Sequence, residues 1–336
     1  MDVGTHALAS IALTRALVPR ARLTAWIAIV TAGTLADIDA LGAIFGPSAY
    51  LDWHHTYTHS ILATAIVGVI PGIAYLLLRQ RSTSAAVHKG LFLSTVLLAG
   101  FLHLAMDACQ SDGITAFWPF SARRVATDWL PSVDPWIIAI LIAAILLPEL
   151  SRLVRDEIGA KNKQPRGQIG AIVALILTII YVGVRADIHA GVLATIQART
   201  YRAESPRRAA AYPEYTSLFT WHAIVETDRA LLQLTIDATP GASFDPETGT
   251  TLFKPEPSPI LDAAQNTESA KKFLRMAKFP KASMEKIPDG YQVQIRDLWY
   301  VVSGETRHEI IAMIRTDTTG RVTGDNLLWA RPLRRR

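Results

Sequence analysis

Cysteine is nearly absent from this chain, which narrows the kinds of site it can build. Among 336 residues there is one cysteine, Cys109. A single thiol cannot form an intrachain disulfide, and CxxC zinc or redox motifs are excluded with it. Metal binding in this sequence would therefore depend mainly on histidine and carboxylate side chains.

Charged residues are scarce as well. They make up 19% of the chain against 50% hydrophobic residues, and the mean hydropathy is +0.23. This balance favours a membrane protein over a soluble enzyme. The net charge is only +5, and the cations stand in short clusters between apolar runs, without a basic stripe interleaved with aromatics. We therefore expect no nucleic-acid partner.

Apolar segments recur up to residue 186 and predict an α-helical polytopic membrane domain over residues 1–190. Five of them are near or somewhat below the roughly 20 residues that span a bilayer. These five are Leu23–Phe45, Ile61–Leu78, Gly90–Met106, Pro135–Pro148 and Ile169–Val184. The shorter run Thr5–Val18 is either a sixth crossing or an interfacial helix, so we expect five to six membrane helices.

Positive charge between the segments predicts their orientation. If all six segments cross, the three loops that carry most Lys and Arg fall on one side, which the positive-inside rule makes cytoplasmic. The cations in these loops are Arg15, Arg20, Arg22, Arg79, Arg81, Lys89, Arg152, Arg155, Lys161, Lys163 and Arg166. The N-terminus, the other two loops and everything after residue 186 then face outward.

The composition changes after Gln197. A polar, Pro-containing passage is followed by the strand-like runs ALLQLTID, GYQVQI, WYVV and EIIAMIRT, which one helical stretch, Ile260–Ala277, interrupts. We interpret residues 198–336 as a soluble α+β domain of mainly antiparallel strands, on the extracytoplasmic side.

Ionisable side chains gather at one level of the predicted topology. Such residues in or beside membrane segments are costly and therefore usually functional. On the six-crossing topology all of them lie at the outward ends of their segments; they are His6, Asp37, Asp39, His54, His55, His59, His103 and Asp107. The orientation predicted from the charge of the loops therefore places all these residues in one layer, at the outer boundary of the membrane.

The spacing within this layer suggests metal ligation. His103 and Asp107 are four residues apart, so both project from one helical face and can bind one ion. Asp37 and Asp39 diverge on a helix, so either the helix ends there or only one of them binds.

The stretch WHHTYTHS places three histidines in six positions, at 54, 55 and 59. We expect Thr56 or Thr58 to cap the third segment, with His54 in the loop and His59 in the first helical turn. His55 is expected to face solvent or to lie behind the ligands.

Mixed imidazole and carboxylate ligands suit Zn²⁺ or another borderline divalent ion, one or two in number. A catalytic ion would lower the pKa of water toward about 7, and Asp37 or Asp39 would act as general base. Each piece also has a plainer interpretation: His6 as an interfacial polar residue, the two aspartates as a helix end, and HxxxD as a chance match. Together on one face they favour a metal site.

Four blocks of the sequence resemble a known family in order. GTHALAS, GTLADIDAL, HHTYTHS and HLAMDACQSDGITAFWPFSARRVATDWLPSVDP are similar to the blocks of the YdjM family of membrane-bound metal-dependent hydrolases, also called LexA-regulated inner-membrane proteins. The resemblance covers about residues 1–136, and PEYTSLFTWHAIVET is a weaker match. It implies a multi-pass hydrolase of the bacterial inner (cytoplasmic) membrane with the ligand set His6, Asp37, Asp39, His54, His59, His103 and Asp107.

The sequence departs from the family pattern at two positions. His55 stands where the pattern His-Arg-x-x-Thr-His-Ser has Arg, which leaves open what replaces that side chain's anion contact. Ala36 stands where the second block commonly has Pro, while both aspartates remain.

Aromatic and basic residues follow the fourth block. Trp118, Arg123 and Arg124 can lie on headgroups and bind a phosphate, or they form a simple aromatic belt. Asp134 and Pro135 are expected to begin the fifth segment as its cap.

Three functions remain open. The first is hydrolysis of a phosphoester or phospholipid headgroup at the membrane boundary, with lipid as environment and substrate. The second is a metal-binding transporter, although the middle of the segments offers no obvious relay. The third is a non-catalytic, metal-stabilised protein that binds an envelope partner.

Overall fold

The computed structural model describes residues 1–79, 88–157, 167–304 and 309–330. Four of the cations used above for orientation lie outside the described residues: Arg81, Lys161, Lys163 and Arg166. The side chains of Arg79, Arg152 and Arg155 lie outside them too.

The chain divides into two compact units that do not follow one another in sequence. The first contains Met1–Asp39 and His54–Ala186, and the second contains Ala40–Trp53 and Asp187–Arg336. The short segment 40–53 therefore belongs with the C-terminal residues, although its neighbours on both sides belong to the first unit.

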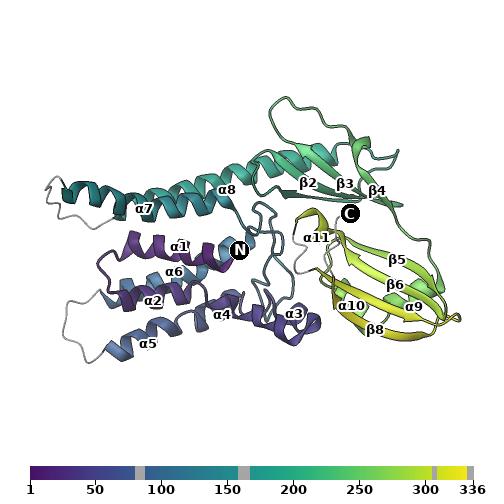
Figure 1. Cartoon of the computed structure of the whole chain (residues 1–336), viewed down its shortest axis with the longest axis horizontal. Coiled ribbons are helices and arrows are strands. Elements are labelled where there is room, and N and C mark those ends of the chain that lie inside the picture. The colour runs from purple at the N-terminus through teal and green to yellow at the C-terminus, as the bar shows by residue number, and fades with distance from the viewer. Residues whose placement is uncertain (80–87, 158–166, 305–308, 331–336) are drawn as a thin grey trace. The chain divides into compact units, whose positions relative to one another are not determined.

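Helices make up the first unit (Figure 1). They are α1 (Val3–Leu17), α2 (Leu23–Ala32), the 3-10 helix η1 (Leu35–Phe45), α4 (Ile61–Val67), α5 (Ile70–Arg79), α6 (Lys89–Ala108), α7 (Pro135–Glu157) and α8 (Gln168–Gln197). The second half of η1 and the end of α8 continue into the second unit.

Three helical stretches are long and apolar enough to cross a membrane, namely Ile61–Leu78, Lys89–Ala108 and Gln168–Gln197. The pair α2 and η1 gives a fourth if it is one broken span, since the two pass the same test together but bend by 55°. The predicted helical membrane region is thus confirmed with three to four candidate spans among the described residues.

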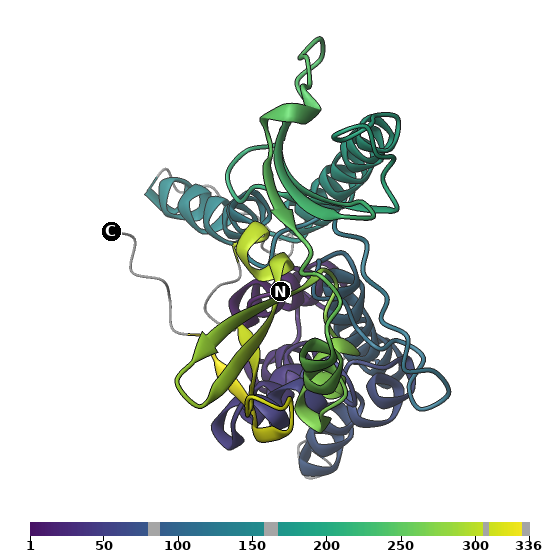
Figure 2. The same ribbon diagram turned by 90° about the vertical axis from the view of Figure 1, so that its right-hand side faces the viewer.

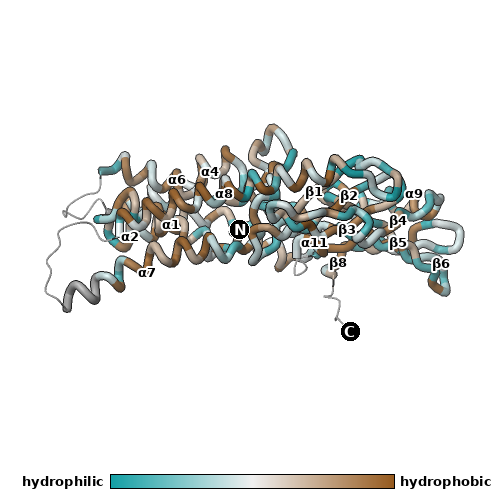
Figure 3. The backbone as a smooth tube through the Cα atoms, turned by 90° about the horizontal axis from the view of Figure 1, so that it is seen from above, coloured by the Kyte–Doolittle hydropathy of each residue, from teal (hydrophilic) through white to brown (hydrophobic). Residues whose placement is uncertain are grey.

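Hydrophobic residues, brown in Figure 3, predominate along these helices, and many of the large ones are exposed. Leu78, Ile176 and Ile179 are among the large hydrophobic side chains that stay exposed, at 84%, 51% and 72%. Such side chains are stable when they contact lipid. Many of the buried residues inside the unit are small. Ala12, Ala25 and Ala99 are at most 1% exposed, which lets helices approach closely where lipid offers no hydrophobic driving force.

One local prediction for this unit needs correction, and two segments have a shape that the sequence did not specify. The segment Leu23–Phe45 is not one straight helix, because α2 ends before the bend and η1 follows it. The helix after Pro135 continues through Pro148 to Glu157. The cap of the third segment is Ser60, whose side chain accepts a hydrogen bond from the Ala63 amide, and neither threonine takes this role. The predicted cap at Asp134 is confirmed, since its Oδ1 accepts from the Trp136 and Ile137 amides at 2.9 and 3.1 Å.

Two antiparallel four-stranded sheets form most of the second unit. The first has the order β1 (Arg208–Pro213), β2 (Thr220–Glu226), β3 (Ala230–Asp237), β4 (Thr250–Phe253), and the second β5 (Pro280–Ile287), β6 (Gly290–Asp297), β7 (Ile310–Thr316), β8 (Val322–Trp329). Each of β3 and β7 begins with three buried residues, after which buried and less buried positions alternate as in a half-buried strand. The expectation of mainly antiparallel strands is confirmed.

Short helices accompany the sheets (Figures 1 and 2). They are η2 (Pro246–Thr248), α9 (Pro259–Gln265), α10 (Glu268–Leu274) and α11 (Leu298–Val302), together with α3 (Pro47–Trp53) from the segment 40–53. The predicted helical stretch Ile260–Ala277 is therefore two helices, of which α10 begins at its cap Thr267. The prediction of WYVV as a strand is wrong, because these residues form helix α11. Asp297 caps this helix by accepting a hydrogen bond from the Trp299 amide.

Candidate metal centre

The predicted histidines and aspartates of the first unit come together from four segments. His6 lies on α1, Asp37 and Asp39 on η1, the histidines of WHHTYTHS in the turn before α4, and His103 and Asp107 on α6. Most of these side chains are buried, with His59 and Asp107 at 0% and His103 at 2% exposed.

Four atoms within this cluster converge on one point. His59 Nε2 and His103 Nε2 are 3.1 Å apart, and Asp107 Oδ2 lies 3.2 and 3.1 Å from them. Asp37 Oδ1 lies 3.8 and 3.6 Å from the same two nitrogens. Ligands about 2.0–2.1 Å from a tetrahedral ion are themselves separated by about 3.3 Å. His59 Nε2, His103 Nε2 and Asp107 Oδ2 thus have the spacing of ligands that could hold one metal ion, with Asp37 Oδ1 next to them.

The imidazoles are oriented for ligation by bonds on their other nitrogen. His103 Nδ1 donates to the carbonyl oxygen of Gly33 at 2.9 Å, and His59 Nδ1 lies 2.8 Å from Asp39 Oδ2. A neutral imidazole with its proton on Nδ1 turns the lone pair of Nε2 toward the cluster. Two nitrogen lone pairs and two carboxylate oxygens then face each other, and a cation between them removes the repulsion.

Unpaired atoms also favour a bound cation. Among the described residues, Asp37 Oδ2 and His6 Nδ1 are buried without a hydrogen-bond partner, and Asp107 Oδ2 meets only the two Nε2 atoms, which carry no proton in this tautomer. Buried polar atoms are rarely left in this state, because each costs about 1–3 kcal/mol. The donor set of imidazole and carboxylate atoms fits a borderline divalent ion such as Zn²⁺.

The electrostatics of His59 agree with this assignment. Burial lowers the pKa of His59, but hydrogen bonds to Asp107, Asp37 and Asp39 outweigh it and raise that pKa well above its usual value. The raised pKa means that these carboxylates favour a positive charge at His59 Nε2, and a divalent ion bound there would supply that charge in place of a proton.

His6 lies beside the converging atoms. Its ring stacks on His103 with 3.7 Å between centroids, and its Nε2 is 3.1 Å from Asp107 Oδ1, which also contacts the amino group of Met1. His6, Asp37, His103 and Asp107 each have a ligand atom within 4.8 Å of the others.

Asp39 differs from the other aspartates because both its oxygens already have partners. Oδ1 lies 3.3 Å from His54 Nδ1, and Oδ2 accepts from the His55 amide at 2.9 Å and from Thr58 Oγ1 at 2.8 Å, besides contacting His59. This pattern is typical of a carboxylate that orients a ligand. The predictions that Asp39 is itself a ligand and a base are not tested by it.

A second group lies next to the first. His54 Nε2 and His55 Nδ1 are each 3.3 Å from Asp112 Oδ2, and the two rings stack at 3.9 Å. His55 is 5% exposed, so the solvent-facing alternative is wrong. Its Nδ1 also contacts the Gly113 carbonyl oxygen at 2.9 Å.

Asp112 was not among the sequence-predicted residues. The available signal was its place just after α6, five residues beyond Asp107 within the same family-like block. The residue is held on the other side by Arg124, whose Nη1 donates to Asp112 Oδ1 at 3.2 Å and whose Nη2 donates to the His54 carbonyl oxygen at 2.8 Å.

The three predicted substrate-binding residues are placed differently. Arg124 reaches the edge of the second group, as just described. Trp118 packs edge-on against Tyr57 at 5.2 Å. Arg123 is exposed, and its backbone amide donates to Ser121 Oγ at 3.2 Å.

Comparison with known proteins gives a family and one distant relative. The uncharacterized protein YfhP of Bacillus subtilis (strain 168) is 33% identical over 156 residues, which are 44% of this chain and 46% of YfhP. The matched part thus spans about half the length of this curated relative. No solved structure matches the chain. The family model of the YdjM inner membrane protein matches residues 1–189, which include every residue of the candidate metal centre, and the chain belongs to this family.

Proposed function

We propose that this chain is a membrane-embedded, metal-dependent hydrolase of a phosphoester, and that its substrate is a phospholipid headgroup at the membrane boundary. The observation that carries the proposal is the convergence of His59, His103, Asp107 and Asp37 at the spacing of metal ligands, with buried oxygen atoms that lack other partners. A merely structural zinc site is usually closed by four ligands that include Cys, whereas this cluster has further His and Asp side chains around it.

The residues divide the work as follows. His59, His103 and Asp107 would hold the ion and leave its fourth position to water, with Asp37 and His6 beside them, while Asp39 orients His59 and His54. A bound divalent ion supplies Lewis acidity and lowers the pKa of water in the site toward about 7. Asp37 Oδ2, which has no partner among the described residues, would take a proton from the water whose oxygen bonds to phosphorus; the ester P–O bond breaks, and the leaving alkoxide takes up a proton from solvent.

Substrate contacts lie at the edge of the cluster. Arg124 brings a guanidinium group next to Asp112 and His54, where it favours an anionic ester. Trp118 and the exposed Arg123 are the residues that we assign to the headgroup region. The group of His54, His55 and Asp112 is where a second ion would bind.

The proposal includes an orientation. With α1 and α7 counted as crossings the chain has five to six membrane helices, and the loops rich in Lys and Arg then face the cytoplasm. The metal centre and residues 198–336 face outward, where the outer headgroups lie.

The test uses the purified full chain in detergent or nanodiscs. We expect bound zinc and release of phosphate or headgroup from a phospholipid panel, with both lost in His103→Ala and Asp107→Asn. His88→Ala serves as the matched control, because His88 is exposed and lies outside the cluster. Activity that persists in His103→Ala would contradict the proposal.

Other outcomes would identify the alternatives. Bound metal without turnover on any phosphoester would indicate a non-catalytic, metal-stabilised protein with an envelope partner. Metal flux into proteoliposomes, abolished by the same substitutions, would indicate a transporter.

A further inference from the structure

The segment 40–53 is folded into the second unit although it stands between two blocks of the metal centre. Asp39 precedes it and His54 follows it, and both belong to the first unit. Asp39 Oδ1 and His54 Nδ1 are 3.3 Å apart, so the segment is a loop whose two ends meet within the candidate site.

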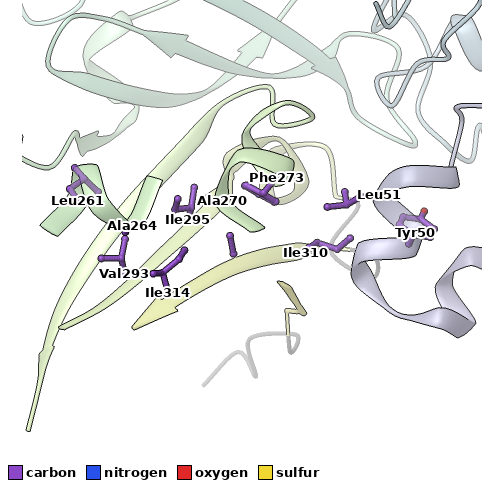
Figure 4. Packing of buried hydrophobic residues seen from close by; sticks show 11 residues of the cluster. Tyr50, Leu51, Leu261, Ala264, Ala270, Phe273, Val293, Ile295, Ile310 and Ile314 are labelled. Carbon is purple, nitrogen blue, oxygen red and sulfur yellow. The ribbon is translucent and has the colours of Figure 1, made fainter. Parts of the chain in front are cut away.

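Apolar side chains fix this loop in the core of the second unit (Figure 4). Tyr50 and Leu51 on α3 are 8% and 7% exposed and lie in one cluster with Phe273 of α10 and Ile310 of β7. The Tyr50 ring also meets Trp329 of β8 edge-on, with 5.3 Å between centroids. This burial ties α3 to residues more than two hundred positions away.

Hydrogen bonds from one lysine also hold α3 in place. Lys272 Nζ on α10 donates to Ser48 Oγ and to Asp52 Oδ2, both at 2.6 Å. The Lys272 side chain is 17% exposed, and Asp52 is 48% exposed. The lysine thus holds both ends of α3 at once.

The fixed loop limits the conformations of the residues that follow it. Trp53 leads directly to His54 and His55, and His55 has a φ of 57°, a left-handed conformation that costs free energy for a residue other than Gly. The conformation persists because its surroundings hold it, including the bond from the His55 amide to Asp39. Anchoring the loop therefore reduces the entropy lost when His54, His55 and His59 are ordered for ligation.

We propose that the second unit positions the metal centre through the segment 40–53, and that Tyr50, Leu51 and Lys272 are positioning residues for a site that they do not touch. The inference rests on the proposed metal site. It assigns to the C-terminal part of the chain, which lies beyond the family match, a function in preorganising the histidines of WHHTYTHS.

The experiment measures metal binding directly. Purified full-length variants are titrated with zinc against a chelator, and the visible spectrum of Co²⁺ at the site reports its geometry. Lys272→Met should weaken zinc binding about two- to tenfold and alter the Co²⁺ spectrum, and Tyr50→Ala should weaken binding more than about tenfold, as for other groups that orient ligands.

Two controls separate positioning from general stability. Lys271→Met changes a neighbouring, exposed lysine of the same helix and should leave zinc affinity unchanged. The exchange Lys272→Asp with Asp52→Lys restores the ion pair and should recover the Co²⁺ spectrum that Lys272→Asp alone loses. The lysine variants keep the test decisive if Tyr50→Ala does not fold.

The outcomes distinguish this inference from the proposed function. Wild-type protein that binds no metal would overturn both. Zinc binding that depends on His103 but is the same in Lys272→Met, Lys272→Asp and Lys271→Met would overturn the positioning role alone.

Discussion

At the scale of single residues, the geometry of the site depends on the hydrogen bonds that the two histidines make through Nδ1, the ring nitrogen that faces away from the cluster. The Gly33 carbonyl oxygen orients His103 through a hydrogen bond, and the carboxylate of Asp39 orients His59 in the same way. Such partners fix the tautomer and direction of an imidazole, and their loss typically weakens metal binding about 10- to 100-fold. The two histidines therefore respond to changes at different places in the sequence.

Asp39→Asn tests the orienting role of this carboxylate. The amide keeps the shape of the side chain but loses its charge and places an NH₂ group against donors, so His59 is held less well. We expect zinc affinity to fall about 10- to 100-fold while one equivalent still binds at high concentration. Competition with a chelator measures this.

Thr58→Val is the matched control, because it removes one donor to Asp39 and leaves the carboxylate in place. Its effect should be smaller than that of Asp39→Asn. Complete loss of zinc in Asp39→Asn, equal to the loss in His103→Ala, would show that Asp39 is a ligand.

The sequence predicted the members of the cluster better than their arrangement. His103 and Asp107 could be paired from their spacing, because both lie on one regular helix. The contact of His103 with the Gly33 carbonyl could not be predicted, since every residue carries this group and only tertiary packing selects one. Asp112 was missed for a related reason: it follows the helix end, where no periodicity fixes the direction of a side chain.

At the scale of elements, the break between α2 and η1 places Asp37 and Asp39 in the site. α2 ends at Ala32, and Gly33 follows with a φ of −79°. The bend of 55° turns η1 away from the axis of α2. Hydropathy alone predicted one continuous segment here, because the apolar run passes through the break without a change in composition.

Gly33→Ala tests the close packing at this break. An added Cβ would overlap Ser10 Oγ on α1 and lie 3.3 Å from the Ala99 Cβ on α6. Its φ is one that any residue adopts, so the cost comes from crowding. We expect about 1–3 kcal/mol lower stability and weaker zinc binding, since the Gly33 carbonyl moves relative to His103. Thermal unfolding in detergent and zinc competition measure the two effects.

Gly183→Ala is the control for a glycine-to-alanine change in a membrane helix, because nothing lies within 4 Å of its added Cβ. It should be neutral or slightly stabilising. Adding Ser10→Ala to Gly33→Ala removes the overlapping hydroxyl and should recover part of the loss. A Gly33→Ala protein as stable as wild type would contradict the close approach of α1 and α2.

Two strand predictions in the second unit had opposite outcomes, which the burial pattern of one segment and the tertiary hydrogen bonds of the other explain. ALLQLTID forms β3, and its burial alternates from Leu232 to Asp237, so this part of its pattern was informative. WYVV has β-forming residues, yet the Asp297 carboxylate caps it as a helix. The same carboxylate also accepts hydrogen bonds from the Lys278 and Phe279 amides. Tertiary hydrogen bonds thus override local propensity there.

At the scale of the whole molecule, the sequence predicts a change of character near residue 190 but not the membership of residues 40–53 in the second unit. Segment 40–53 is continuous with an apolar run, so composition assigns it to the membrane region. Its assignment depends on Tyr50 and Leu51 packing against residues far along the chain, and such long-range contacts leave no local signal.

Orientation can be tested by labelling single cysteines in intact and permeabilised spheroplasts with a membrane-impermeant maleimide. Burial raises the pKa of Cys109 to about 11, so this thiol is mostly protonated at neutral pH, and Cys109→Ser removes its remaining reactivity. On that background, Ala122→Cys in the exposed loop after α6 and Ala242→Cys in the second unit should label from outside. Ala85→Cys, in a loop that the positive-inside rule makes cytoplasmic, should label only after permeabilisation. Equal labelling of all three positions in intact spheroplasts would contradict the six-crossing topology, and with it the placement of the metal centre at the outer headgroups.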